Sequence, residues 1–324
     1  MRTLSHLFGR STAHFPRTLR LISVEALTLC YLGLSMAIAL VFSSRMPLTE
    51  MFIARGTSLI VMGSLIGLYY AWPCRATLLV RYLFPFAGLG TWYGETYRFN
   101  LLWPNLDPWF SQLEQNIFGG QPSLWLPEWL NSIWWSEAFN FGYWAYYVII
   151  VTVLVGIYFD RFSRFEKSAF IALCSFYLFY LVYLFVPVTG PQYYFQAVGL
   201  DTIVSGVFPN VGDYFQHHNV LLPTTDYGGF FMGLVEQTQA RGEYPTAAFP
   251  SSHVGVSTVM MMLAYRWRKG VFWGLMPIYI LLCISTVYTQ AHYAIDAFAG
   301  FIAGYLIYRL SEGIRHKRYP ILAY

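Results

Sequence analysis

Charged residues are scarce in this chain of 324 residues, because Asp, Glu, Lys and Arg together make up only 11% of it. Soluble globular domains carry about 25%. A surface so poor in charge does not keep a folded domain in water, and the composition excludes an ordinary soluble protein. Cysteine is scarce too, and its four residues lie in or beside apolar runs: Cys30, Cys74, Cys174 and Cys283. Because no Cys-x-x-Cys pair or Cys/His spacing of the zinc type occurs, we expect no metal site.

Apolar residues are abundant instead. They make up 56% of the chain, and aromatic residues make up 20%, as expected where rings lie at both surfaces of a bilayer. Eight stretches are long enough to cross the hydrocarbon layer, which takes a helix of about 20 residues. They run over 20–42, 52–72, 77–94, 139–159, 167–187, 252–267, 271–290 and 293–310. The sequence therefore predicts an all-α, polytopic transmembrane bundle of about eight spans.

The basic residues are divided unequally between the two sides of these spans. With the N-terminus inside, all but four of the 20 fall on the cytoplasmic side, as expected for Lys and Arg in short loops. The four on the outer side are Arg45, Arg55, Arg98 and Arg241. The net charge of +4 is thus the balance of a basic inner side and an acidic outer side, and we expect no nucleic-acid partner. Both termini are predicted to be cytoplasmic. The sequence identifies no protein partner.

Two outer segments are too long to be turns. Residues 95–138 are rich in tryptophan and contain several prolines, and they are expected to form one or two short helices in the membrane interface. Residues 188–251 are rich in Gly, Pro, Tyr and Asp, and are polar enough to face water. Loops of this length are usually functional or disordered, and the aromatic content favours order.

A proline, two serines and a histidine precede the sixth apolar stretch, in the run Phe249-Pro-Ser-Ser-His253. Proline stops the preceding backbone, and a serine can cap the helix that follows. The N–H groups in the first turn of a helix attract anions, so this terminus suits a phosphoryl group. Ser251 and Ser252 are therefore candidate phosphate-binding residues, with His253 in or next to the same turn.

A second histidine follows in the run Ser285-Thr-Val-Tyr-Thr-Gln-Ala-His292-Tyr-Ala-Ile-Asp296. On a helix, His292 and Asp296 would share a face, so the carboxylate could accept from one imidazole nitrogen and leave the other free as a nucleophile or base. Two membrane crossings separate His253 from His292, which returns both to the outer side. The alternative is a pair of satisfied core histidines. The capped anion site, the His/Asp pair and the shared side argue against it.

These runs resemble the second and third motifs of the type-2 phosphatidic acid phosphatase superfamily, Pro-Ser-Gly-His and Ser-Arg-x5-His-x3-Asp. They are most similar to one branch, the inositol phosphorylceramide synthases named for aureobasidin resistance, in Phe-Pro-Ser-x-His and in Ser-Thr-x-Tyr-x3-His-Tyr-x2-Asp. Weaker similarity lies in Asp107…Phe118-Gly-Gly-Gln-Pro122 and in Pro187-Val-Thr-Gly-Pro191. The resemblance covers roughly residues 92–310.

The resemblance implies a six-helix phosphatase-like core and a covalent phosphohistidine mechanism without metal or cofactor. His292 would be the nucleophile that attacks phosphorus, and Asp296 would orient it. His253 would be the general acid and then the general base, while Ser251 and Ser252 would hold phosphate oxygens.

This core gives the expected domains. Residues 1–76 would form an N-terminal two-helix membrane segment, 77–310 the six-helix catalytic membrane core with its two outer segments, and 311–324 a basic cytoplasmic tail.

The chain departs from the phosphatase pattern where that pattern has cations. Thr286 replaces the motif arginine, and Tyr183 and Gly190 stand where the first motif, Lys-x6-Arg-Pro, has its Lys and Arg. Without these cations a doubly charged phosphate monoester would be poorly neutralised, so a lipid phosphodiester is the favoured substrate. Arg241 and Arg98 are the nearby outer basic residues that could supply a charge to the phosphate.

We therefore predict transfer of a phosphoinositol-type headgroup from an anionic glycerophospholipid to a ceramide or similar lipid alcohol. One alternative is a lipid phosphate or polyprenyl diphosphate phosphatase, and another is a non-catalytic lipid-binding membrane protein. The sequence has no Asn-x-Ser/Thr glycosylation acceptor and its loops are short. Both features favour a bacterial inner membrane with the site facing the periplasm; in a eukaryote the site would face the Golgi lumen.

Overall fold

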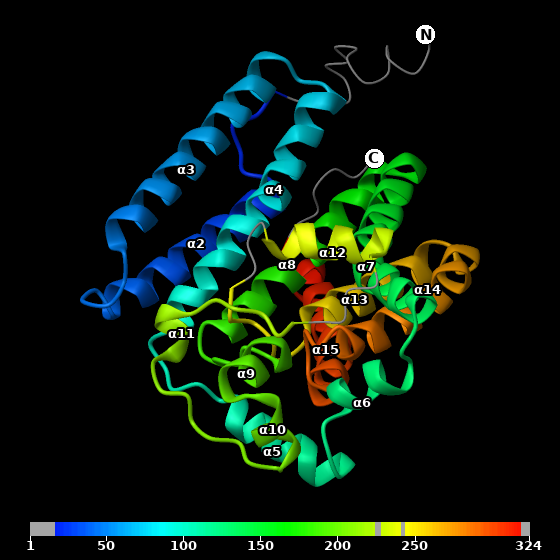
Figure 1. The fold of residues 1–324 in the computed structure, drawn as a ribbon. Coiled ribbons are helices and arrows are strands. Elements are labelled where there is room, and N and C mark those ends of the chain that lie inside the picture. Colours follow the sequence, from blue (N-terminus) through cyan, green and yellow to red (C-terminus); the bar gives the residue numbers. More distant parts are fainter. Residues whose placement is uncertain (1–16, 224–227, 241–243, 319–324) are drawn as a thin grey trace. The chain divides into compact units, whose positions relative to one another are not determined.

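A computed structural model describes residues 17–223, 228–240 and 244–318, and every regular element in these ranges is a helix (Figure 1). The all-α prediction is confirmed. Eight of the helices coincide with the eight apolar stretches: α2 (Ser23–Val41), α3 (Leu48–Ala71), α4 (Arg75–Asn100), α7 (Ile133–Asp160), α8 (Phe162–Tyr183), α13 (Ser252–Trp267), α14 (Lys269–Tyr288) and α15 (Ala294–Arg318).

Six of these helices are long and apolar enough to cross a membrane, namely α2, α3, α7, α8, α14 and the Ala294–Gly313 part of α15. They indicate an integral membrane protein. The other two differ, because α13 has only 16 residues and α4, with 26, is less apolar. The count of eight spans and the cytoplasmic position of both termini therefore stay predictions. The chain ends themselves, and the last part of the expected basic tail, lie outside the described residues.

The chain divides into two compact units, Met1–Trp92 and Tyr93–Tyr324, and the division falls within α4. In the first unit a buried ion pair joins two helices. The guanidinium of Arg81 donates to both carboxylate oxygens of Glu25, at 2.8 and 2.6 Å. Both side chains are buried, so the pair and its two hydrogen bonds explain how charged groups are tolerated among apolar helices.

In the second unit α13 lies among α7, α8, α14 and α15 and packs on all four. Small residues allow its close approach to α15. A Cβ atom added at Gly300 or Gly304 would overlap the carbonyl oxygen of Ser251 or Gly255, respectively. Glycines four residues apart give two membrane helices this kind of backbone contact. The contact fixes the N-terminus of α13 against the first turns of α15, which is where the candidate residues lie.

Short helices form both long segments, whereas the sequence predicts them only for residues 95–138. α5 (Asp107–Phe118) and α6 (Pro122–Trp129) lie between α4 and α7. The longer segment contains α9 (Pro191–Val198), α10 (Leu200–Val204), α11 (Tyr214–His217) and α12 (Phe230–Ala240). Of these, α9 and α10 lie with α5 towards the lower end of the second unit in Figure 1. The position of these helices in a membrane interface stays a prediction.

Candidate active site

The two histidines singled out from the sequence are in direct contact. Nδ1 of His253 lies 3.3 Å from Nε2 of His292. His253 belongs to the first turn of α13, and His292 lies in the short loop between α14 and α15. The hairpin of α13 and α14 thus returns the chain to the end from which it started.

The orientation of His292 is set by a backbone carbonyl. Nδ1 of His292 lies 2.7 Å from the oxygen of Ala248, and the ring is only 3% exposed. A carbonyl oxygen can only accept, so Nδ1 carries the proton of the neutral ring. The lone pair is then on Nε2, the nitrogen that faces His253. This is the atom that can act as a nucleophile.

Asp296 is near His292 but is not its hydrogen-bond partner. Its Oδ2 lies 3.8 Å from Nδ1 of His292, beyond hydrogen-bond distance, and accepts from the backbone N–H of Tyr293 at 2.9 Å. The expectation that both residues share a helix is wrong, because α15 begins at Ala294, after His292. The first N–H groups of a helix lack intrahelical acceptors, and Asp296 supplies one for the residue just before α15. Its carboxylate therefore fixes the turn that carries His292.

The first turn of α13 is more fully hydrogen-bonded than its sequence suggests. Oγ of Ser251 accepts from the N–H of Val254 at 3.4 Å, as the predicted cap, and Ser251 is completely buried. The N–H of Ser252 donates to the hydroxyl of Tyr183 at 3.0 Å. Of the two serines, Ser252 lines the cavity beside the histidines. Arg241 lies outside the described residues.

This cavity is small, about 20 Å³, which is room for roughly one water molecule. Hydroxyl, amide and aromatic groups line it, and neither Lys nor Arg occurs among the described residues of its wall. Two tyrosines of α7 flank the imidazole of His253, with ring centroids 4.6 Å away for Tyr143 and 4.7 Å for Tyr146. The described wall thus surrounds the two imidazoles with uncharged side chains.

The three positions at which phosphatases carry cations are occupied by packing contacts. Gly190 has a φ of +88°, and a Cβ there would lie 2.6 Å from the carbonyl oxygen of Ala291. The buried hydroxyl of Tyr183 donates to Pro250 O at 2.9 Å. Thr286 is buried within α14, and its hydroxyl donates to Cys283 O at 2.9 Å. No arginine side chain could be added at Gly190 without moving the loop that carries His292.

A carboxylate of α5 supports the loop that carries His292 by hydrogen bonds. Asp107, which the sequence pointed to only through the weaker similarity, is fully buried. It accepts from the N–H and hydroxyl of Thr189 at 2.7 and 2.9 Å, from Gly190 N at 2.8 Å, and from the Tyr293 hydroxyl at 3.0 Å. Asn105 adds a fifth bond at 2.7 Å. Asp107 therefore joins the segment at Gly190 to the residue next to His292.

Glu114, which lies on the same buried face of α5 as Asp107, is a functional candidate that the sequence reasoning missed. Its Oε1 accepts from the N–H groups of Ala294 and, at 3.2 Å, Ile295, so it caps α15 from another helix. Burial, followed by the nearby charge of Asp296, raises the pKa of Glu114 to about 8. Asp107, Ser111 and Glu114 recur at helical spacing and are all buried. That buried polar stripe is the sequence signal that could have revealed Glu114.

The sequence profile of the PAP2 superfamily matches residues 108–310, more than half of the chain. The matched range includes His253, His292 and Asp296. No curated protein and no solved structure matches the chain in such comparisons.

Proposed function

The chain belongs to the PAP2 superfamily of phosphatases and phosphotransferases, and we propose that it transfers a phosphoinositol-type headgroup from an anionic glycerophospholipid to a ceramide or similar lipid alcohol. This is the reaction of the inositol phosphorylceramide synthases that its motifs resemble. One observation carries the proposal: the contact between His253 and His292 lies in a cavity whose described wall contains no cation.

The lack of a cation in the described wall favours a substrate with a single negative charge. A phosphate monoester carries up to two negative charges near neutral pH, whereas a phosphodiester carries one. In a confined site a second charge without a cation is costly, because little water is present to solvate it. The groups beside the histidines are hydroxyls and amides, which stabilise a singly charged phosphate by hydrogen bonds. A phosphodiester lipid therefore fits this site better than a phosphatidic acid or a lipid diphosphate.

The reaction proceeds in two displacements. Nε2 of His292 attacks phosphorus, a P–N bond forms, and the bond from phosphorus to the diacylglycerol oxygen breaks. That oxygen takes a proton from protonated His253, which the negative phosphate would stabilise. The hydroxyl of the acceptor then attacks phosphorus and gives its proton to His253, while the P–N bond breaks and returns the lone pair to Nε2. In-line attack requires phosphorus to enter between the two rings, so substrate binding would replace their direct contact.

An apolar groove supports a lipid as substrate. It has a volume of about 400 Å³ and lies between α14 and α15, next to the loop that carries His292. Val287 and Ala294 form its end nearest this loop, and Phe298 and Phe301 line it further along α15. A groove of this size with an apolar wall suits an acyl chain. We propose that it guides a lipid chain so that the phosphate reaches His292.

We also propose that the protein lies in a bacterial inner membrane, with the site on the periplasmic side.

Headgroup transfer can be tested with the purified chain in lipid nanodiscs. Phosphatidylinositol labelled in its headgroup and ceramide are supplied together, and labelled phosphoinositol-ceramide is expected without release of inorganic phosphate. Phosphatidic acid is the comparison substrate. Rapid phosphate release from phosphatidic acid, with no transfer to ceramide, would identify a phosphatase and contradict the proposal.

A further inference from the structure

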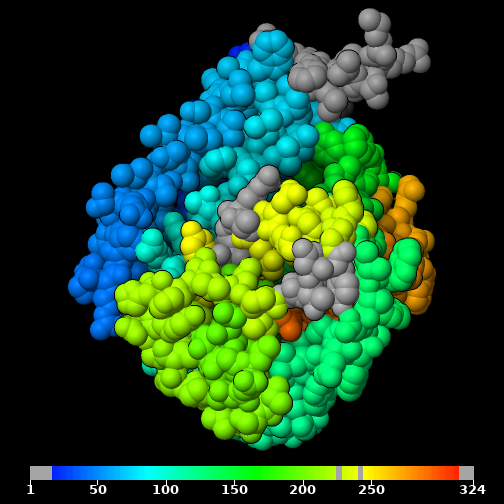
Figure 2. Space-filling model, in the orientation of Figure 1, coloured from blue at the N-terminus to red at the C-terminus, as the bar shows by residue number. Residues whose placement is uncertain are grey.

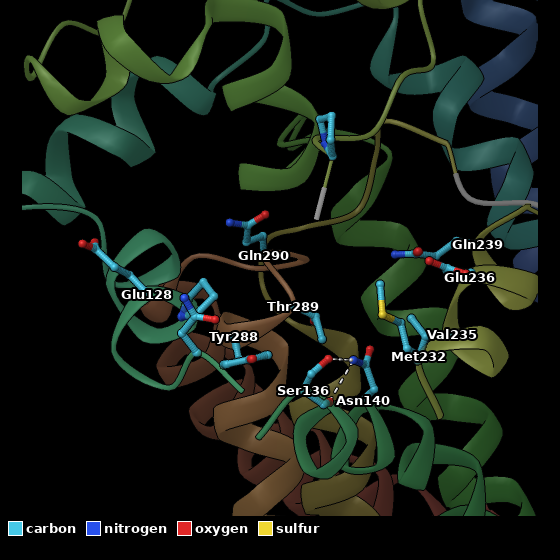
Figure 3. Close-up of a pocket in the computed structure, with 13 residues that line it drawn as sticks. Glu128, Ser136, Asn140, Met232, Val235, Glu236, Gln239, Tyr288, Thr289 and Gln290 are labelled. Carbon is cyan, nitrogen blue, oxygen red and sulfur yellow. Dashed lines mark hydrogen bonds between the residues drawn. The ribbon is translucent and has the colours of Figure 1, made fainter. Parts of the chain in front are cut away.

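A second, larger pocket lies beside the catalytic cavity. Its volume is about 240 Å³, and it is formed by α6, α7, α12 and the end of α14 (Figure 3). This is smaller than the roughly 300–1,000 Å³ of pockets for drug-sized ligands, and it is on the scale of one sugar ring rather than of a whole lipid. Figure 2 shows a hollow at this place, bordered by the green segment with α6 and α7 and by the yellow-green segment, with orange atoms at its floor.

The wall of this pocket has the chemistry of a site for neutral hydroxyl compounds. Its side chains include two carboxylates, Glu128 and Glu236, and several amides, among them Asn140, Gln239 and Gln290. Amides and carboxylates pair well with the hydroxyl groups of a polyol. Among the described residues of the wall there is no Lys, Arg or His. Two carboxylates without a cation repel a phosphate group, so a neutral ligand is favoured over an anion.

Gln290 supplies the sharpest indication of a ligand. Its side chain is 9% exposed, and its Oε1 atom is buried with no hydrogen-bond partner among the described residues. Its Nε2 donates to Ser123 O at 3.3 Å, and its φ of +60° is in the left-handed region. Buried polar atoms are rarely left without a partner, and strained backbone collects at functional sites. In Figure 3 Gln290 lies across the pocket from Ser136 and Asn140.

A pair of glutamines separates this pocket from the catalytic cavity. Nε2 of Gln239, in the wall of the pocket, donates to Oε1 of Gln192, in the wall of the cavity, at 3.3 Å. Gln290 is two residues from His292, and its carbonyl oxygen accepts from the N–H of Gln192 at 2.9 Å. The two glutamine side chains therefore stand between a phosphate at His292 and the larger pocket.

We propose that the pocket between α6, α7 and α12 binds the neutral polyol headgroup of the donor lipid, with the amides of Asn140, Gln239 and Gln290 as hydrogen-bond partners for its hydroxyls. This inference rests on the proposed transfer reaction and adds the basis on which the headgroup is selected. Because the described residues of the wall include two carboxylates and no cation, a phosphorylated headgroup gains less from it than a ring of hydroxyls does.

The first test uses donor choice. Phosphatidylinositol and phosphatidylmethanol have the same phosphodiester charge, but only the first carries a polyol. Wild-type protein is expected to prefer phosphatidylinositol in kcat/KM, and Asn140→Leu is expected to lower that preference about tenfold or more, because hydroxyl partners in the wall are lost. Asn116→Leu makes the same change at an exposed position of α5 and should leave the preference unaltered. An unchanged preference in Asn140→Leu overturns the proposal.

The second test does not depend on turnover. In the His292→Ala protein, myo-inositol is expected to raise the melting temperature, whereas cyclohexanol, which has one hydroxyl, is not. Glu236→Gln is a milder variant at an exposed position and should reduce the myo-inositol effect even if Asn140→Leu does not fold. A myo-inositol effect that survives in both pocket variants overturns the proposal. If wild-type protein shows no transfer in the first test, while myo-inositol raises the melting temperature of His292→Ala and no longer does so in the pocket variants, the proposed reaction is wrong and the polyol site stands.

Discussion

The hydroxyl of Tyr293 donates to Oδ1 of Asp107 at 3.0 Å, although the two residues are 186 positions apart in the chain. Tyr293 follows His292 directly, and the same carboxylate holds the N–H groups of Thr189 and Gly190. The position of His292, the proposed nucleophile, is therefore supported by a carboxylate of α5 through the neighbouring residue.

Asp107→Asn tests this support. The amide retains the size of the carboxylate, but its NH₂ group would face N–H and O–H donors, which leaves buried groups unpaired. We expect a loss of about 3 kcal/mol in the free energy of unfolding and a clear fall in headgroup transfer. Tyr293→Phe, which removes one of the five bonds to Asp107 and the bond between its hydroxyl and Ser111 Oγ, should cost about 2 kcal/mol. Thermal unfolding in detergent and transfer assays measure both. Equal melting temperatures for Asp107→Asn and wild type would show that the carboxylate is dispensable.

Glu114 gives a pH dependence of stability. Its pKa of about 8 lies above the ordinary value of about 4.3, so the folded state keeps the proton over a range in which the unfolded state has lost it. The contribution of Glu114 to stability is therefore highest below about pH 4 and falls as pH rises towards 8. Glu114→Gln removes this loss, so its melting temperature relative to wild type should rise between pH 5 and pH 8. A constant difference across that range would contradict a raised pKa.

Substitution of Gly190 tests the close contact between this residue and Ala291, in the loop that carries His292. An alanine there would be strained at a φ of +88° and would press on the carbonyl of Ala291. Gly199, with a φ of +91° and nothing within 4 Å of an added Cβ, is a matched control. We expect Gly199→Ala to lose about 1 kcal/mol of stability and to keep transfer, because it shows the backbone cost alone. Gly190→Ala should be less stable still and should lose most of its transfer activity. Equal effects of the two variants would refute the role of the contact.

Asp296 tests how His292 is oriented. Because Nδ1 of His292 is bonded to Ala248 O, the ring should keep its orientation when the carboxylate becomes an amide. Asp296→Asn is therefore expected to lower kcat about 10- to 100-fold, the scale found for groups that support a metal-bound histidine, and much less than His292→Ala. If Asp296→Asn were as inactive as His292→Ala, the carboxylate would be as necessary as the nucleophile itself, and Ala248 would not be sufficient to orient the ring.

The sequence was sufficient to locate the long helices and the two histidines, for physical reasons that the structure makes clear. Apolar runs long enough to cross a bilayer have few alternatives to a helix, and α2, α3, α7, α8, α14 and α15 follow them. The serine cap at Ser251 was also predictable, because capping depends on a few adjacent residues.

Contacts between distant segments were not predictable in this way. Helical spacing placed His292 on a helix with Asp296, but the helix begins two residues after His292, and the bond to Ala248 depends on tertiary packing. Glu114 was missed for the same reason, since its partners at Ala294 and Ile295 lie far along the chain. The buried polar stripe on α5 is visible in the sequence, whereas what it faces is not.

The most direct test of the proposed mechanism is to identify the covalent intermediate. Wild-type protein is mixed with phosphatidylinositol labelled at phosphorus, without acceptor, and quenched in alkali, in which a phosphoramidate survives. Peptide mass spectrometry is expected to find the phosphoinositol group on His292, to find none in His292→Ala, and to show its loss when ceramide is added before the quench. Label on another residue, or continued transfer by His292→Ala, would contradict the assignment of His292 as the nucleophile.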